Sequence, residues 1–409
     1  MGHCSEPGRL GYSYYAFKPT LCARTPNCSR VPWALKKRED SMNERVKFKD
    51  LEKYYTKNRE FQGIPGIEIS PSGRLWVTWY SGGVGEGSEN YVVLVTSDDD
   101  GLSWSEPVAV VDPSGSIRAF DPTLWVGPDG VLRWFWSEAD SRNNCISDGV
   151  DGVWFSECSD IESSSPEWSQ PVRVANGVMM NKPMVASNGD WLLPTALWRD
   201  KIGGVEALEE LKSECFSNVT VSVDGGKTFS LRGGADVANR VYDEHHIVEL
   251  KDGRLWCLVR TAYGIGHSFS SDSGLTWSKE DSLVFEGPSS RFFIRRLSSG
   301  NLLMVYNNPC KENRVVRENL TAWISKDDGR SWVGGLLLDE RCEVSYPDGC
   351  QDKDGYIRII YDHSRYKSGD ILMAKFTEDE VLAGKLVSEG SRLKQLVNST
   401  GGVLSKITK

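Results

Sequence analysis

The sequence contains no run of about 18 apolar residues, the length that a membrane-spanning helix requires. Its N-terminus also lacks the succession of basic, apolar and small residues that marks a secretory signal. Both absences lead us to expect a soluble, cytoplasmic protein. Residues 1–45 show neither helical nor strand periodicity, and we expect them to be a disordered extension or the product of a wrong start site.

Metal-ligating and redox-active patterns are missing as well. The ten cysteines form no CxxC pair and no ligand rhythm. A chain of 409 residues buries a core without disulfide bonds, so we expect reduced and mostly buried thiols. No cofactor is expected, and no visible ligand set demands a metal, with calcium in acidic loops left open.

Basic residues do not dominate the chain. There are 48 Lys and Arg against 57 Asp and Glu, a formal net charge of −9. This balance therefore does not favour nucleic acid or an anionic membrane surface as a partner, and we expect neither. A neutral ligand, or one recognised by a local group of charges, fits this composition better.

The residues that are abundant favour short strands and tight turns. The chain has 15 Trp, 40 Gly and 17 Pro. From about residue 60, a polar turn with glycine precedes a strand rich in Leu, Trp and Val six times. These turns carry Gly73, Gly130, Gly189, Gly253, Gly300 and Gly355. Each one predicts a β-hairpin, because glycine adopts a positive φ without strain.

The spacing of these turns predicts the fold. Successive glycines lie 57, 59, 64, 47 and 55 residues apart. Such an interval accommodates one four-stranded sheet, so the six hairpin units predict an all-β, six-bladed β-propeller.

A second motif, S-x-D-x-G-x-[ST]-[WF], follows four of the hairpins. It occurs at residues 97–104, 222–229, 270–277 and 325–332. Its Asp accepts hydrogen bonds from the turn's own backbone and its aromatic residue packs between sheets. We therefore predict that these aspartates are structural and none is catalytic.

These four copies resemble the Asp boxes, or BNR repeats, of the sialidase superfamily. The resemblance covers about residues 60–385 and implies a sialidase-type propeller over residues 46–390, followed by a C-terminal tail at 391–409. Sialidases use three arginines to hold a sugar carboxylate, a tyrosine nucleophile assisted by a glutamate, and an aspartate as acid and base. The family's F-R-I-P landmark reads Phe61-Gln62-Gly63-Ile64-Pro65 here, so the first arginine is absent.

Four further landmarks match in order along the chain. The resemblance implies Tyr346 as nucleophile, Glu244 as its base, and Arg260 and Arg317 as the second and third arginines. Asp362 takes a position where the family often has an acidic residue that orients an arginine. As an alternative, Glu244 and Arg260 form only a buried ion pair.

Other candidates rest on weaker grounds. The loop after the first hairpin offers Glu86 and Glu89 in place of the aspartate, and we choose Glu89 as acid and base because it directly precedes a strand. Further candidates for substrate binding are His245, His246, Asp121, Lys182 and Arg291. Either Lys182 or Arg291 is a possible replacement for the missing charge.

The resulting hypothesis is an exo-acting glycoside hydrolase that removes a terminal, acidic sugar with retention through a tyrosine nucleophile. One alternative is a polysaccharide lyase with a His or Tyr base that acts on a uronate. Another is a propeller that binds carbohydrate without catalysis.

Overall fold

The computed structural model describes residues 45–140, 149–150, 152–198, 207–279, 283–309 and 314–401. Residues 43–409 form one compact unit. The N-terminal extension considered above lies almost entirely outside the described residues. No helix among those described is long and apolar enough to cross a membrane.

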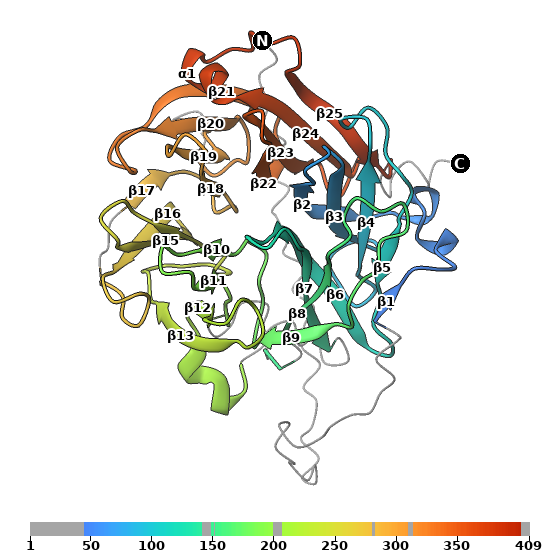
Figure 1. The fold of residues 1–409 in the computed structure, drawn as a ribbon, viewed down its shortest axis with the longest axis horizontal. Coiled ribbons are helices and arrows are strands. Elements are labelled where there is room, and N and C mark those ends of the chain that lie inside the picture. The colour runs from blue at the N-terminus through green and yellow to red at the C-terminus, as the bar shows by residue number, and fades with distance from the viewer. Residues whose placement is uncertain are drawn as a thin grey trace, which may run out of the picture. The chain divides into compact units, whose positions relative to one another are not determined.

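Six antiparallel sheets surround a central axis, so the predicted six-bladed propeller is confirmed (Figure 1). The first three blades contain β2 (Gln62–Ile69), β3 (Leu75–Ser81), β4 (Tyr91–Ser97) and β5 (Ala109–Val111); β6 (Ile117–Val126), β7 (Leu132–Asp140), β8 (Gly152–Cys158) and β9 (Val172–Ala175); and β10 (Met184–Val185), β11 (Trp191–Leu193), β12 (Ser217–Ser222) and β13 (Ser230–Ala235). A short strand, β1 (Val46–Lys47), pairs with β5 at the edge of the first blade.

The last three blades follow the same plan. They contain β14 (His246–Glu249), β15 (Leu255–Thr261), β16 (Gly264–Ser270) and β17 (Leu283–Glu286); β18 (Phe293–Arg296), β19 (Leu302–Asn307), β20 (Leu320–Ser325) and β21 (Val333–Asp339); and β22 (Val344–Gln351), β23 (Tyr356–His363), β24 (Asp370–Thr377) and β25 (Arg392–Ser399). The described helices are the 3-10 turns η3 (Glu52–Tyr54), η4 (Thr56–Asn58) and η7 (Glu209–Glu214), and α1 (Glu378–Ala383).

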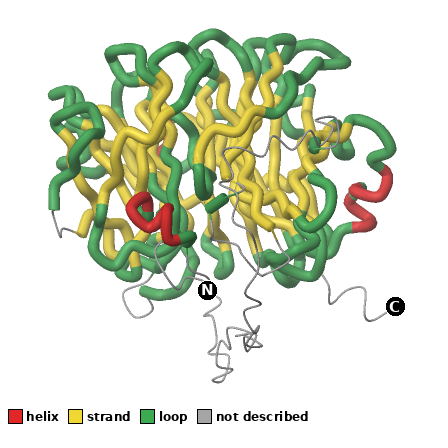
Figure 2. Tube along the Cα trace, turned by 90° about the horizontal axis from the view of Figure 1, so that it is seen from below, coloured by secondary structure: helices red, strands yellow, loops and turns green. Residues whose placement is uncertain are grey.

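The second strand of a blade shows why these sequences form stacked sheets. All seven residues of β3, including Trp76 and Trp79, are buried. Since neighbouring blades cover both faces of such a strand, large apolar residues replace the simple apolar-polar alternation. Figure 2 shows these strands running between loops at the two ends of the propeller.

The end of the chain extends the last blade further than the sequence indicates. We expected residues 391–409 to be a tail, but residues 392–399 form β25, the outer strand of the sixth blade. Asn398 also ties this strand to the first blade, because its Oδ1 accepts hydrogen bonds from Arg59 and Gln62 at 2.8 and 3.0 Å. The sequence in this strand gives no alternation from which the pairing could be read.

The four Asp boxes have one geometry. In the third box, Ser270 donates to Asp272 at 2.7 Å, and Asp272 accepts from the backbone and the hydroxyl of Thr276 at 2.9 and 2.5 Å. These hydrogen bonds lower the pKa of Asp272 to about 2. The aspartates of the other three boxes have the same partners and the same lowered pKa. The interpretation of the boxes as structural turns is therefore confirmed.

The cysteines depart in part from expectation. Cys158, Cys257 and Cys350 are free and buried, and Cys215 is free and half-buried. Cys342, however, is disulfide-bonded, contrary to the expectation of reduced thiols throughout.

The innermost strands change register where they enter the central channel. In β2, β6 and β22 the pairing shifts around an X-Pro step. The residue before each proline has a positive φ: Ile64 at 57°, Asp121 at 48° and Tyr346 at 57°. Such a conformation costs a non-glycine residue about 1–3 kcal/mol and redirects its side chain out of the sheet alternation. The bulge thereby turns Asp121 and Tyr346 away from their sheet positions.

Candidate active site

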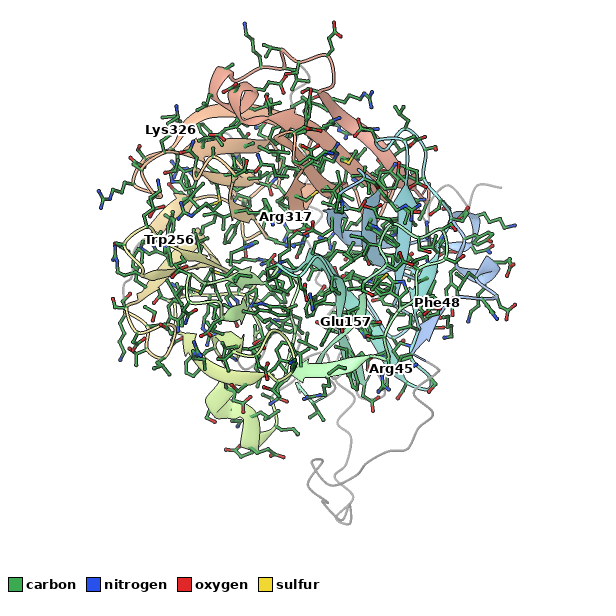
Figure 3. The ribbon with its side chains drawn as sticks, in the orientation of Figure 1. Arg45, Phe48, Glu157, Trp256, Arg317 and Lys326 are labelled. Carbon is green, nitrogen blue, oxygen red and sulfur yellow. The ribbon has the colours of Figure 1, made fainter. Side chains whose placement is uncertain are left out.

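The candidate residues gather at one end of the channel, which we call the site end. The innermost strands start there and the second strands of the blades finish there, because the two are antiparallel. Tyr346 is near the start of β22, Glu244 lies two residues before β14, and Arg260 is near the end of β15. The six hairpin glycines lie at the opposite end, the turn end. Figure 3 shows Arg317 near the centre of the ring.

Tyr346, Glu244 and Arg260 are in mutual contact. The phenol of Tyr346 donates to Glu244 Oε1 at 3.1 Å, and Arg260 Nη1 donates to the same Oε1 at 2.7 Å and to the phenol oxygen at 3.0 Å. All three residues are at most 6% exposed. Glu244 Oε2 has no hydrogen-bond partner among the described residues. A buried phenol thus faces a carboxylate oxygen that is able to accept its proton.

The groups around Tyr346 shift the pKa of its phenol in opposite directions. Burial raises its pKa, and so does the negative charge of Glu244. The positive charges of Arg260, Arg317 and Arg365 oppose this rise in the pKa. The phenol is therefore protonated at neutral pH, and the three guanidinium groups would stabilise negative charge on its oxygen.

Two further arginines cover the ring of Tyr346. The guanidinium carbon of Arg317 lies 5.2 Å from the ring centroid, and Arg317 Nη2 donates to the carbonyl of Ser289 at 2.9 Å. The guanidinium carbon of Arg365 lies 4.5 Å from the same centroid. Arg365 was not among the residues singled out in the sequence, since it lies in the β23–β24 loop and matches no landmark.

Asp362 holds this region together. Its Oδ1 accepts from the Ser345 hydroxyl at 2.7 Å and its Oδ2 from the Ile64 backbone at 2.9 Å. Its Oδ2 is also 3.4 Å from Arg365 Nε. The carboxylate thus contacts an arginine, as expected of an orienting residue, and it links the sixth blade to the first.

Asp121 occupies the bulge of the second blade. It is 4% exposed, and burial, followed by the negative charges of Glu86 and Glu244, raises its pKa to about 8. Arg118, on the same strand, lies with its guanidinium carbon 4.0 Å from the Phe120 ring centroid. The Nε and Nη1 atoms of Arg118 are buried and have no hydrogen-bond partner among the described residues. The sequence analysis missed Arg118, whose only signal is its position three residues before Asp121.

The two glutamates of the loop after β3 are placed differently. Glu86 Oε1 lies 3.0 Å from Arg365 Nη1 and contacts the cluster through it. Glu89 is exposed, and its carboxylate folds back toward the Gly83 backbone. The choice of Glu89 over Glu86 stays a prediction, but Glu86 is the one that contacts an arginine beside Tyr346.

Lys182 and Arg291 bind groups in the interior of the channel. Lys182 Nζ lies 3.0 Å from Glu68 and 3.2 Å from Asp348, and it also donates to the carbonyls of Ile67 and Leu124. Arg291 is fully buried and donates to Asn181 and to the carbonyl of Met180. Both cations are therefore already engaged by groups of the channel, and their proposed role in replacing the missing charge stays a prediction.

His245 and His246 are buried among backbone groups. The ring nitrogens of His245 lie 2.9 Å from the Asp243 carbonyl and 2.8 Å from the Asn218 carbonyl. His246 Nε2 lies 2.9 Å from the Phe292 carbonyl. Burial lowers the pKa of both imidazoles. Both rings are therefore neutral and engaged by the backbone, a poor setting for a base or a substrate ligand.

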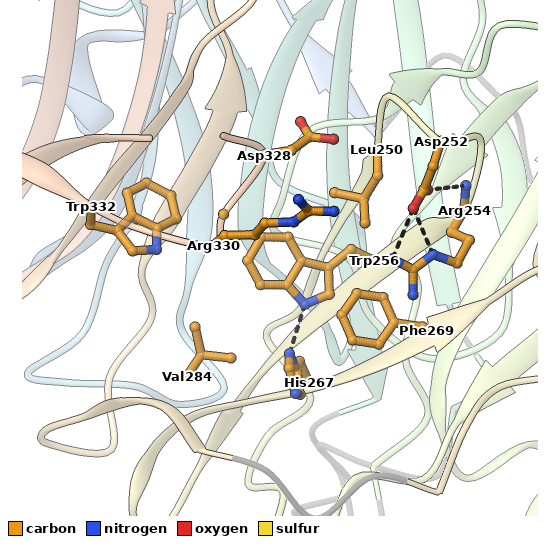
Figure 4. Close-up of a pocket in the computed structure, with 11 residues that line it drawn as sticks. Leu250, Asp252, Arg254, Trp256, His267, Phe269, Val284, Asp328, Arg330 and Trp332 are labelled. Atoms are coloured by element: carbon orange, nitrogen blue, oxygen red, sulfur yellow. Dashed lines mark hydrogen bonds and ion pairs between the residues drawn. The ribbon is translucent and has the colours of Figure 1, made fainter. Parts of the chain in front are cut away.

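Two larger cavities lie away from Tyr346. One, of about 320 Å³, opens beside Trp256, Phe269 and Trp332 between the fourth and fifth blades (Figure 4). The other, of about 410 Å³, is at the turn end and is lined by Gly127, Lys182, His246 and Glu249 among others. Neither contains a residue of the Tyr346 cluster. Within the described ranges, no three His, Cys, Asp or Glu residues are placed to hold a metal ion.

Comparison with protein families gives one match. The model of the BNR repeat-like domain matches residues 71–359, which is more than two thirds of the chain. No curated protein sequence matches the chain significantly.

Solved structures share the fold at low identity. The intramolecular trans-sialidase from Ruminococcus gnavus, in complex with oseltamivir carboxylate, has 15% identity and a TM-score of 0.60 over 81% of this chain and 97% of that one. A leech intramolecular trans-sialidase has 15% identity and a TM-score of 0.62 over 81% and 70%. A point mutant of the NanB sialidase from Streptococcus pneumoniae has 14% identity and a TM-score of 0.55 over 75% of this chain and 66% of that one, so this chain spans just under two thirds of its length.

Proposed function

Because the chain belongs to the BNR repeat-like domain family within the sialidase superfamily, we propose that it is an exo-acting glycosidase that removes a terminal acidic sugar through Tyr346. The observation that carries this proposal is the 3.1 Å hydrogen bond between the Tyr346 phenol and Glu244. These residues are 102 positions apart in the sequence, and a purely structural ion pair of Glu244 with Arg260 would not require the phenol.

The first step forms a bond between the tyrosine and the sugar. As the phenol oxygen of Tyr346 attacks the anomeric carbon, Glu244 takes the phenol proton and the bond to the leaving oxygen breaks. A carboxyl group protonates that oxygen. Water then cleaves the tyrosyl–sugar bond with the same groups in reversed roles, so the anomeric configuration is retained.

A tyrosine suits an acidic sugar on electrostatic grounds. A carboxylate nucleophile would be repelled by a negative charge beside the anomeric carbon, whereas a neutral phenol would not. Its proton departs only as the new bond forms, which requires the adjacent base because an isolated phenol has a pKa near 10. Arg260 and Arg317 bind the anionic group of the sugar in this proposal.

The proton donor is a carboxyl group at the site end. The sequence favours Glu89, but burial and electrostatics favour Asp121. A pKa of about 8 keeps Asp121 protonated at neutral pH, which is the state that a general acid needs. Asp121→Asn is expected to lower the rate about 10²-fold to 10⁴-fold. If Glu86→Gln or Glu89→Gln has that effect and Asp121→Asn does not, the loop supplies the donor.

The function is tested with a panel of glycans that end in sialic, ulosonic, uronic or neutral sugars. We expect the wild-type protein to release one or more of the acidic sugars and Tyr346→Phe to release none above background. Tyr356→Phe, in the same blade but at the turn end, is the matched control and should retain wild-type activity.

Other outcomes assign the two alternative functions. Products that absorb in the ultraviolet as unsaturated uronates would indicate a lyase. Binding of a glycan without any product, equal in wild type and Tyr346→Phe, would indicate a non-catalytic binding protein. Equal release of sugar by both proteins would rule out the tyrosine mechanism.

A further inference from the structure

The missing arginine of the first blade leaves a vacant side-chain position at Gly63. Gly63 precedes Ile64-Pro65, as the arginine precedes Ile-Pro in the F-R-I-P landmark. A Cβ atom placed on Gly63 would lie 2.1 Å from Cδ and 2.8 Å from Cγ of Arg365. The aliphatic part of Arg365 therefore occupies the space through which a side chain at position 63 would pass.

We infer that Arg365 replaces the missing arginine from a different blade and completes a site of three guanidinium groups, so that the substrate sugar carries a carboxylate. This inference rests on the proposed glycosidase function and specifies its substrate class. It assigns the positive charge of the missing arginine to Arg365, since Lys182 and Arg291 are already engaged by other groups.

The contacts of Arg365 fix its direction. Its Nε lies 3.4 Å from Asp362 and its Nη1 lies 3.0 Å from Glu86, and its side chain is 10% exposed. Its Nη2 makes no hydrogen bond to the described residues. Two carboxylates thus orient the guanidinium group over the Tyr346 ring and leave one N–H₂ group for a ligand.

The three arginines surround the same phenol. Arg260 donates to the oxygen of Tyr346, and the guanidinium carbons of Arg317 and Arg365 lie 5.2 and 4.5 Å from its ring centroid. Among the described residues, Arg317 has no carboxylate partner, and its Nη2 donates only to a carbonyl. Arg317 therefore offers a guanidinium group whose charge no carboxylate of the described residues balances, and which an anionic ligand group would balance.

The topology explains how an arginine of the sixth blade can take the place of one in the first blade. The sixth blade closes the ring against the first, and β2 packs beside β22 and β23. The β23–β24 loop, which carries Arg365, lies at the site end because β23 runs antiparallel to β22. A side chain from this loop therefore reaches the space beside Gly63.

The experiment compares two ligands that differ in one charge. The probes are oseltamivir carboxylate, a cyclic carboxylate present in the Ruminococcus gnavus structure, and its ethyl ester, which keeps the amine but lacks the carboxylate charge. Isothermal titration calorimetry on the full chain gives the ratio of the two affinities. We expect the wild type to favour the carboxylate at least about tenfold, and Arg365→Ala to reduce this preference by about tenfold to a hundredfold.

Two further variants separate charge placement from damage to the fold. Lys367→Ala removes a positive charge from the same loop, where Lys367 pairs with Glu343 and is largely exposed, and should leave the preference unchanged. The double variant Gly63→Arg/Arg365→Ala returns the arginine to the first blade and should restore the preference. Gly63 has no positive φ, and Asp362 Oδ2, 3.1 Å from the new Cβ, would pair with the new side chain.

Each outcome decides the inference. If the wild type binds neither compound, or binds both equally, or if Arg365→Ala retains the wild-type preference, Arg365 does not serve a carboxylate site. If the double variant fails to restore what Arg365→Ala loses although it unfolds like the wild type, the replacement of position 63 is refuted. A charge preference that depends on Arg365, together with absence of hydrolysis, would refute the glycosidase proposal alone.

Discussion

At the scale of single residues, the site places carboxyl groups in opposite surroundings. Glu244 is paired with Arg260 at 2.7 Å, whereas Asp121 is buried and its pKa is about 8. In the mechanism that we propose, Glu244 serves as the base and Asp121 as the acid. The division of roles therefore follows from the neighbours of the two side chains and not from their chemical type.

The raised pKa of Asp121 predicts a pH dependence of stability. Between about pH 4 and pH 8 the unfolded chain ionises this carboxyl and the folded chain keeps it protonated, so its contribution to stability is lost as the pH rises. Asp121→Asn removes this loss. Relative to wild type, the unfolding free energy of the variant should increase from pH 4.5 to pH 8 by up to about 5 kcal/mol, measured by urea denaturation.

The control for this measurement is Asp272→Asn. The pKa of Asp272 is lowered to about 2, so both its folded and its unfolded titrations lie below pH 4.5. The difference in unfolding free energy between Asp272→Asn and the wild type should therefore stay constant between pH 4.5 and pH 8. A constant difference for Asp121→Asn as well would show that Asp121 is ionised in the folded protein.

At the scale of elements, glycine turns have two distinct roles. Gly253 lies in a hairpin turn with φ of 87° and open space around its missing side chain. Gly329 lies in an Asp box with φ of 89°, and a Cβ there would be 2.4 Å from the Trp256 ring. The backbone requirement is the same in both turns, but only the Asp box requires contact with a neighbouring blade.

This pair of glycines allows strain and packing to be separated. Gly253→Ala should cost about 1–2 kcal/mol, because only the positive φ is penalised. Gly329→Ala should cost a further 1–3 kcal/mol or so, since the methyl group also displaces the Trp256 ring. Chemical denaturation gives the loss of unfolding free energy in each variant. Equal losses in the two variants would mean that the Trp256 ring moves aside freely.

At the scale of the whole propeller, side chains close the ring and fill its centre. The first and last blades share no strand and are joined by contacts such as Gln62 to the Gly369 carbonyl at 2.7 Å. In the channel, Lys182 contacts the Ile67 carbonyl and the Glu68 carboxylate of β2, the Leu124 carbonyl of β6 and Asp348 of β22. A buried cation that precedes β10 of the third blade therefore contacts three other blades below the site.

Removal of that cation should destabilise the propeller. Lys182→Met leaves Glu68 and Asp348 buried, with their charges no longer compensated by the amine, and is expected to cost about 3–5 kcal/mol of unfolding free energy. Lys367→Met, which breaks an exposed pair with Glu343, should cost less than about 1 kcal/mol. Denaturant unfolding compares the two, and similar small losses would show that the channel network adds little to stability.

The sequence by itself determined the blades, because each hairpin and each Asp box is encoded within a few consecutive residues. The turn glycines need only their own positive φ, and Asp272 needs only Ser270 and Thr276 beside it. Tyr346, Glu244, Arg260 and Arg317 were also found from the sequence, since each lies in a local landmark of the superfamily.

Only the tertiary structure decided which charges face the site. Gly63 and Arg365 lie near opposite ends of the propeller sequence and meet because the ring closes, whereas Lys182 and Arg291 are taken up by partners on other blades. The strand β25 has the same origin, since its pairing depends on β24 and not on its own pattern. Long-range contacts of this kind leave no period or spacing in the sequence, because they depend on how the blades pack.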